Sequence, residues 1–146
     1  MRRLALILPG ILALTVGAPA HAVEPNRLIT ILTAPEPQTQ LMAMVLTRNA
    51  IAAGATAEIL LCGPAGDLAL IDAPASATAG QPPRGASPQA MMLAMMRDHG
   101  VQVQVCAIYL PGRDADASVL LEGVTPAAPD AMGAAIVAPA TTVMSF

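Results

Sequence analysis

The sequence predicts a single-domain α/β sandwich with a mostly parallel sheet, and three observations support this. The chain has 146 residues, which is the length of one domain. Hydrophobic residues make up 55% of it and charged residues 12%, a composition that excludes a disordered chain. After residue 22, short apolar runs alternate with segments of helical spacing up to the C-terminus. Such alternation is typical of strands and helices that build a parallel sheet.

The N-terminus has the three parts of a secretory signal peptide. Met1–Arg3 carries two positive charges, Leu4–Val16 is almost wholly apolar, and the small residues that follow end in Ala20-His21-Ala22. We expect cleavage after Ala22, which divides the chain into a signal peptide at 1–22 and an exported domain at 23–146. The apolar run is shorter than the roughly 20 residues of a spanning helix, so we expect no membrane association after cleavage. In a Gram-negative bacterium the product is periplasmic, in an oxidising compartment.

The first half of the domain predicts two strands with a helix between them. Arg27–Thr33 and Ala55–Leu61 are short apolar runs typical of strands. Gln38–Ala53 has apolar residues near helical spacing, and Gly54 follows as a helix C-cap residue. The remaining segments are a turn at Gly63–Gly66, a short helix at Asp67–Ile71 and a loop at Asp72–Ser87.

The second half begins with a well-marked helix. Ser87 is a favourable N-cap, Pro88 occupies the first helical position, and the helix is expected to run to His99 and to end at Gly100. Val101–Leu110 alternates apolar and polar residues and then continues apolar, which predicts the third strand. The remaining segments are a loop at Pro111–Asp116, a short helix and brief strand within Val119–Val124, a helix at Pro129–Val137 and a closing strand at Thr141–Phe146.

Charge and composition exclude several functions. The formal net charge is −3 and aromatic residues are 1% of the chain, which argues against a nucleic-acid partner. All seven basic residues are arginine, so chemistry that needs a P-loop or Schiff-base lysine is excluded. Cys62, Cys106 and His99 supply at most three of the four ligands of a structural zinc site. We therefore expect no metal and no cofactor.

Four methionines share one predicted helix, namely Met91, Met92, Met95 and Met96. Their spacing is that of a buried helix face, and methionine fills cores well. Copper(I) binding through thioethers is the weaker alternative. His99, near the end of the same helix, is interpreted as a C-terminal capping residue rather than as the partner of a cysteine nucleophile.

The two cysteines are the strongest candidates for chemistry. Cys62 and Cys106 lie near strand ends, at the carboxyl edge where open parallel sheets form their sites. Three alternatives remain open: a structural disulfide across 44 residues, a redox-active or sulfur-handling pair, and two independent thiols. Arg113 is a candidate for lowering a thiol pKa. Gly63 and Gly66 are candidates for binding an anion through backbone N–H groups, against the simpler interpretation of a tight turn.

Several motifs, taken in order, resemble the DsrE/DsrF-like family. They are Val103–Cys106, Glu122–Val124 and Thr142–Phe146, with Leu60–Leu70, Ser87–Gln89 and Val105–Pro111 resembling its small exported branch. The resemblance spans essentially the whole exported domain. It implies a three-layer α/β/α fold with a five-stranded parallel sheet and assembly into trimers or hexamers. In sulfur-relay members a cysteine after the third strand accepts sulfane sulfur as a persulfide, and Cys106 occupies that position.

Two functions follow as expectations. The first is a periplasmic sulfur carrier that holds a persulfide on Cys106, exchanges sulfur with a donor or acceptor protein, and uses Cys62 to resolve or protect it. The second is a non-catalytic oligomeric binding protein with a structural Cys62–Cys106 disulfide. In either case we expect a carrier or binding protein rather than an enzyme that turns over substrate.

Overall fold

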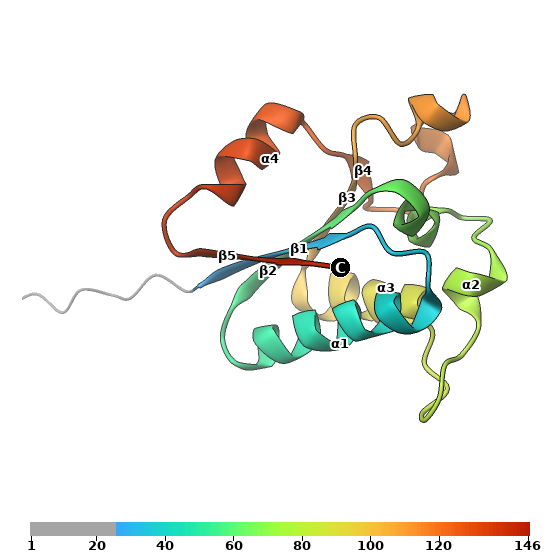
Figure 1. Cartoon of the computed structure of the whole chain (residues 1–146), viewed down its shortest axis with the longest axis horizontal. Coiled ribbons are helices and arrows are strands. Elements are labelled where there is room, and N and C mark those ends of the chain that lie inside the picture. Colours follow the sequence, from blue (N-terminus) through green and yellow to red (C-terminus); the bar gives the residue numbers. More distant parts are fainter. Residues whose placement is uncertain (1–25) are drawn as a thin grey trace, which may run out of the picture.

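A computed structural model describes residues 26–146, so the predicted signal peptide at 1–22 lies outside the described residues. The chain forms a five-stranded parallel sheet with strand order β4-β3-β2-β1-β5. Helices α1 and α3 cover one face of the sheet, and α4 covers the other (Figure 1). The predicted three-layer α/β/α sandwich is therefore confirmed.

The strands are short and lie close to the predicted positions. Their bounds are β1 Arg27–Leu32, β2 Thr56–Leu61, β3 Gln102–Val105, β4 Thr125–Pro126 and β5 Thr141–Ser145. The helices are α1 Pro37–Ala52, α2 Ala75–Thr78, α3 Pro88–His99 and α4 Pro129–Ile136, with 3₁₀ helices η1 Gly63–Ala69, η2 Pro111–Arg113 and η3 Ala117–Val119. Within residues 26–146, no helix combines the length and apolarity needed to cross a membrane.

Four predictions about local structure are wrong, and two of them concern the chain just after β2 and β3. The turn at Gly63–Gly66 and the helix at Asp67–Ile71 form one 3₁₀ helix, η1. The third strand stops at Val105 because the chain turns there, with the Tyr109 amide donating to the Cys106 carbonyl at 2.9 Å.

The fourth strand and the loop before α3 also differ from expectation. The brief strand lies at Thr125–Pro126 instead of near Gly123, since Gly123 has φ +84° and turns the chain just before it. The segment Asp72–Ser87, predicted as loop throughout, contains the short helix α2.

The face covered by α1 and α3 holds the larger core. Met92 and Met95 of α3 are fully buried there, with Met91 and Met96 packed against them, which confirms the methionine face as core. The caps of α3 are also as predicted. The Ser87 hydroxyl accepts from the Ala90 amide at 3.2 Å, and Gly100 closes the helix at φ +64°.

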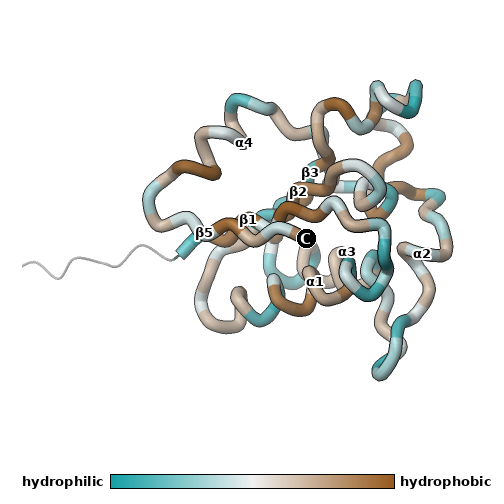
Figure 2. Tube along the Cα trace, in the orientation of Figure 1, coloured by the Kyte–Doolittle hydropathy of each residue, from teal (hydrophilic) through white to brown (hydrophobic). Residues whose placement is uncertain are grey.

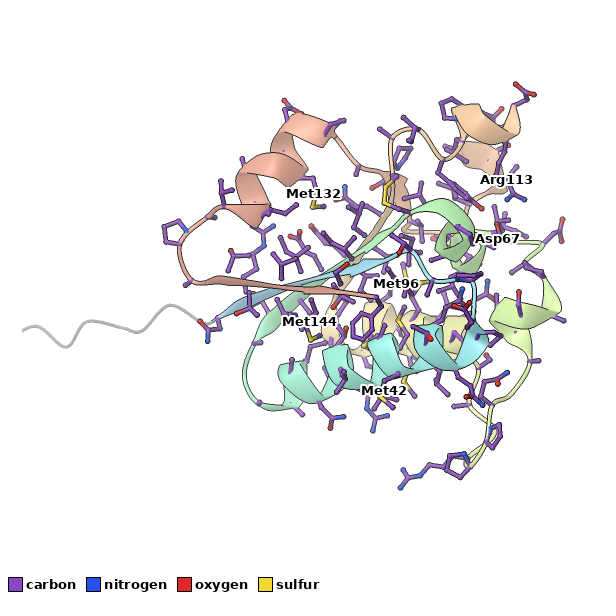
Figure 3. All side chains as sticks on the ribbon, viewed as in Figure 1. Met42, Asp67, Met96, Arg113, Met132 and Met144 are labelled. Atoms are coloured by element: carbon purple, nitrogen blue, oxygen red, sulfur yellow. A yellow bond between two sulfur atoms is a disulfide. The ribbon has the colours of Figure 1, made fainter. Side chains whose placement is uncertain are left out.

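The face covered by α4 has a smaller apolar cluster. It consists of Ile29, Leu60, Ala127, Met132 and Ala135. Figure 3 shows Met132 projecting from α4 toward the sheet. The hydrophobic residues concentrate along β1, β2 and β3, while much of the surrounding loop chain is hydrophilic (Figure 2). Both cysteines pack against this smaller cluster, and Cys106 also packs against the larger core.

Candidate functional site

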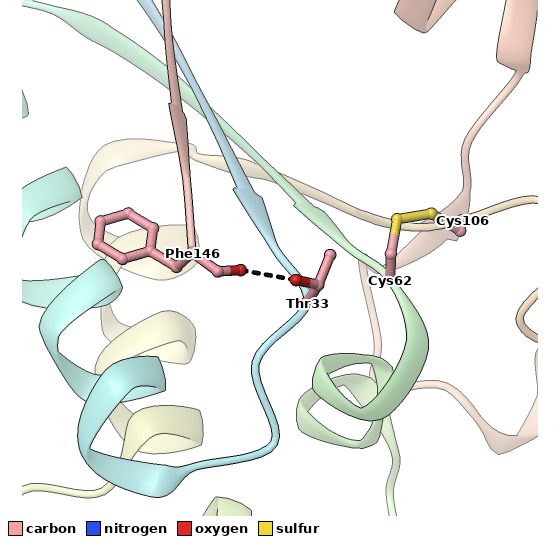
Figure 4. The surroundings of a disulfide bond; sticks show 4 residues. All are labelled: Thr33, Cys62, Cys106 and Phe146. Carbon is pink, nitrogen blue, oxygen red and sulfur yellow. Dashed lines mark hydrogen bonds between the residues drawn. A yellow bond between two sulfur atoms is a disulfide. The ribbon is translucent and has the colours of Figure 1, made fainter.

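A disulfide joins Cys62 to Cys106 just beyond the ends of β2 and β3 (Figure 4). The sheet register explains the pairing. Leu61 lies opposite Val105, so the residues that follow them, Cys62 and Cys106, also lie opposite each other. The Cys106 amide donates to the Leu61 carbonyl at 2.8 Å, and the Cys62 amide donates to the Leu32 carbonyl at 2.9 Å. The two cysteine α-carbons are 5.1 Å apart, within the separation that a disulfide needs.

The disulfide borders a pocket of about 510 Å³ at the carboxyl edge of the sheet. Besides the two cysteines, the pocket is lined by Gly63, Pro64 and Asp67 from η1 and by Ile108, Tyr109, Gly112 and Arg113. Both cysteines are partly exposed. The disulfide is therefore open to a reactant from this side, as the position at the edge of a parallel sheet predicts.

Asp67 joins the two segments that follow the cysteines. The Tyr109 hydroxyl donates to Asp67 Oδ1 at 2.7 Å, and Arg113 Nη1 donates to the same oxygen at 2.7 Å. The Arg113 guanidinium also lies 5.3 Å from the centre of the Tyr109 ring, within the range of a cation–π contact. Figure 3 shows Asp67 and Arg113 close together.

Tyr109 is held as a neutral phenol. Its burial, followed by its hydrogen bond to the Asp67 carboxylate, raises the pKa of Tyr109 above its ordinary value. Burial disfavours the phenolate, and a neighbouring carboxylate disfavours it further. The hydroxyl is the donor in this hydrogen bond, and Asp67 Oδ1 is the acceptor.

The two glycines predicted to bind an anion have different places. Gly63 lines the pocket and has φ +53°, a conformation that favours glycine. Gly66 is buried, and a β-carbon added there would collide with the Tyr109 ring. Gly66 is thus the surface on which the ring packs, and it is not among the residues lining the pocket.

Arg113, the candidate for lowering a thiol pKa, lies in the pocket wall with about half of its side chain exposed, and it is paired with Asp67. Asp67 is therefore not an isolated solvated charge. Asp67 accepts from residues 42 and 46 positions further along the chain, a contact that no local pattern indicates. Its only signal in the sequence is its position after a strand end, shared with Tyr109.

A Cys106–His99 pair is excluded by the fold. His99 is exposed at the end of α3 and lines a different pocket, with residues of α1 and α3 on the opposite face of the sheet from the disulfide. Among residues 26–146, no three or more His, Cys, Asp or Glu side chains come together in a way that would hold a metal ion.

No family model matches the sequence, and no curated protein matches it. Two solved structures share its architecture. One is a protein of unknown function, MTH1491 from Methanobacterium thermoautotrophicum, with a TM-score of 0.60 and 15% identity over 82% of this chain and 98% of its own. The other is the ychN protein from E. coli, with a TM-score of 0.57 and 19% identity over 84% of this chain and 99% of its own.

Both neighbours have the DsrE-like fold. The chain is accordingly an α/β protein of the DsrE-like fold, carrying a cysteine pair at the carboxyl edge of its sheet. At these identities the likeness concerns the fold alone.

Proposed function

We propose that this chain is an exported sulfur carrier that holds sulfane sulfur as a persulfide on Cys106 and uses Cys62 to resolve it. One observation carries the proposal: two cysteines lie opposite each other at the carboxyl edge of a DsrE-like sheet and share an open pocket. A cysteine pair buried for stability alone needs no such access. The persulfide role itself comes from the resemblance of the Cys106 segment to the sulfur-relay members of the family.

Loading begins from the reduced pair. The Cys106 thiolate attacks the outer sulfur of a donor persulfide, R–S–SH. A new bond forms between Cys106 Sγ and that sulfur, the donor S–S bond breaks, and R–S⁻ leaves. Cys106 then carries S–SH, and transfer to an acceptor thiolate repeats the exchange in the opposite sense.

Resolution uses Cys62. Its thiolate attacks Cys106 Sγ, the bond between Sγ and the outer sulfur breaks, and hydrosulfide leaves as the Cys62–Cys106 disulfide forms. Electrons balance, since the sulfane sulfur is reduced to hydrosulfide while the two thiols are oxidised. In the reverse direction, hydrosulfide opens the disulfide and leaves one persulfide and one thiol.

The test is intact mass spectrometry of the reduced protein after treatment with glutathione persulfide. We expect a gain of about 32 Da that reductant removes and that maps to Cys106. The Cys62→Ser variant is the matched control: it should load and retain the sulfur, because it cannot resolve it. Loading that survives Cys106→Ser, or the absence of loading in Cys62→Ser, would overturn the proposal.

A structural role for the disulfide is the second candidate, and the position of the Cys62–Cys106 bond favours this role. The bond joins two neighbouring strands of the sheet and closes a loop of 44 residues, for which chain entropy gives a stabilisation of about 4 kcal/mol. This candidate predicts a large fall in Tm under reductant together with no sulfur loading. A Tm unchanged by reduction would count against it.

Export and assembly are part of the proposal. We propose cleavage after residue 22, a periplasmic location and a homo-oligomer, a trimer or hexamer. Exposed apolar side chains such as Ile71 and Val137 offer surface for association. The intact mass of protein from its native compartment tests the cleavage, because the product should begin at Val23. Light scattering tests the assembly, and a monomer at all concentrations would contradict it.

A further inference from the structure

We infer that Asp67 is a positioning residue that keeps Cys62 and Cys106 opposed after their disulfide opens, and so sets how readily the pair returns to the disulfide. The inference rests on the proposed function only in that the bond is expected to open during the reaction. It assigns to Asp67 a role distinct from binding sulfur.

The geometry places Asp67 as a second tie between the same two segments that the disulfide joins. The helix that carries Asp67 begins directly after Cys62. Its two donors, Tyr109 and Arg113, follow Cys106 on the other segment. The covalent link therefore lies at the start of both segments, and the hydrogen-bonded link lies a few residues further along each.

Burial makes this second tie persistent. Tyr109 is only 7% exposed and rests on Gly66 at a distance that leaves no room for a β-carbon. Its neighbour Leu110 and the η1 residue Leu68 are both buried in the main core. The hydroxyl of Tyr109 thus reaches Asp67 from a fixed ring, which distinguishes this contact from an exposed ion pair of two mobile side chains.

Two links between the same segments are thermodynamically coupled. Each link, once formed, lowers the entropy cost of forming the other. Coupling is reciprocal: the factor by which the disulfide strengthens the Asp67 contacts equals the factor by which those contacts favour the disulfide. Loss of the Asp67 carboxylate should therefore lower the equilibrium constant for disulfide formation as well as stability.

The test measures that equilibrium constant in dithiothreitol redox buffers, which open a structural disulfide as well as a reactive one. We expect Asp67→Ala to lower the constant about tenfold, which corresponds to a coupling of about 1.4 kcal/mol. Asp67→Asn, which keeps one acceptor oxygen without its charge, should fall between Asp67→Ala and the wild type. Tyr109→Phe should shift the constant in the same direction, and it serves as the second variant if Asp67→Ala does not fold.

The matched control is Asp98→Ala. Asp98 also accepts hydrogen bonds from an arginine, but its partner Arg97 is its neighbour in the same helix. Loss of the Asp98 carboxylate should leave the equilibrium constant for disulfide formation at the wild-type value. Reciprocity gives a further check, because Asp67→Ala must lower the unfolding free energy more in the oxidised protein than in the reduced protein.

The inference is overturned if Asp67→Ala leaves the redox constant unchanged, or if it destabilises the oxidised and reduced forms equally. Either result would make Asp67 a structural residue only. The proposed function fails separately, through the absence of sulfur loading on Cys106. A wild-type protein that never loads sulfur, with an Asp67-dependent redox constant, would leave the positioning role intact.

Discussion

The two faces of the sheet differ in how they are built. On one face, α1 and α3 enclose fully buried side chains such as Met44, Met92 and Met95. On the other, the short helix α4 covers a small cluster, and the disulfide lies at its border. The difference separates two tasks. We call the face covered by α1 and α3 the thick face and the face covered by α4 the thin face. Packing on the thick face holds the strands in register, and that register brings Cys62 and Cys106 together at the border of the thin face.

The largest expected effect is the loss of a side chain from the thick face. Met95→Ala removes a fully buried side chain and should lower the unfolding free energy by about 2–5 kcal/mol, since it leaves a cavity. Urea denaturation of the reduced and the oxidised protein measures the loss. Met42→Ala is the control with the same chemistry, because Met42 is 51% exposed; its cost should stay within about 0.5 kcal/mol.

Equal costs at the two methionines would contradict the assignment of the thick face as the source of stability. Sulfur loading of Met95→Ala at low temperature is a further measurement. If the variant still loads sulfur, its strands retain their register, and the two tasks of the two faces are separable.

The second effect concerns the contact that joins the main core to the pocket. In Gly66→Ala the new methyl group collides with the Tyr109 ring, so the ring must move and its bond to Asp67 must weaken. We expect a loss of about 1–3 kcal/mol, the usual cost of overpacking. Gly112→Ala is the control in the same pocket, because a β-carbon there meets no atom within 4 Å. A neutral Gly66→Ala in thermal denaturation would show that the ring is not held as described.

Helix α3 and strand β4 show what the sequence can and cannot predict. Helix α3 is predicted well because Ser87, Pro88 and Gly100 each give a local signal. Strand β4 is misplaced because a two-residue strand has no pattern of its own, and only its pairing with β3 defines it.

The site is only partly predicted, because local signals can be read from the sequence and contacts between distant residues cannot. The position of Cys62 after a strand is local information, whereas the apolar run around Cys106 hides the end of β3 at Val105. The pairing of the two cysteines depends on the register between β2 and β3. Asp67 and Tyr109 are missed because their contact joins residues 42 positions apart. Side chains that act through such distant contacts leave no spacing for a sequence pattern to detect.

The third prediction is a pH dependence that belongs to Tyr109. Because the folded state raises the pKa of Tyr109, its contribution to stability is complete below the unfolded value of about 10. That contribution is lost as the pH rises through the raised folded value, because unfolding then releases the proton. The unfolding free energy of the wild type should therefore fall above pH 10 more steeply than that of Tyr109→Phe. Identical slopes for the two proteins would contradict the buried hydrogen bond to Asp67.

The smallest expected effect lies beside Tyr109. Ile108 is 81% exposed in the pocket wall, so Ile108→Ser should change the unfolding free energy of the single chain by less than about 0.5 kcal/mol. Adjacent residues thus have opposite roles, Tyr109 packing inward and Ile108 facing outward. Thermal denaturation over a range of protein concentrations measures the effect. A loss above about 1 kcal/mol that grows with concentration would mean that another copy of the chain covers Ile108, since burial of an isoleucine contributes about 1.5–3 kcal/mol.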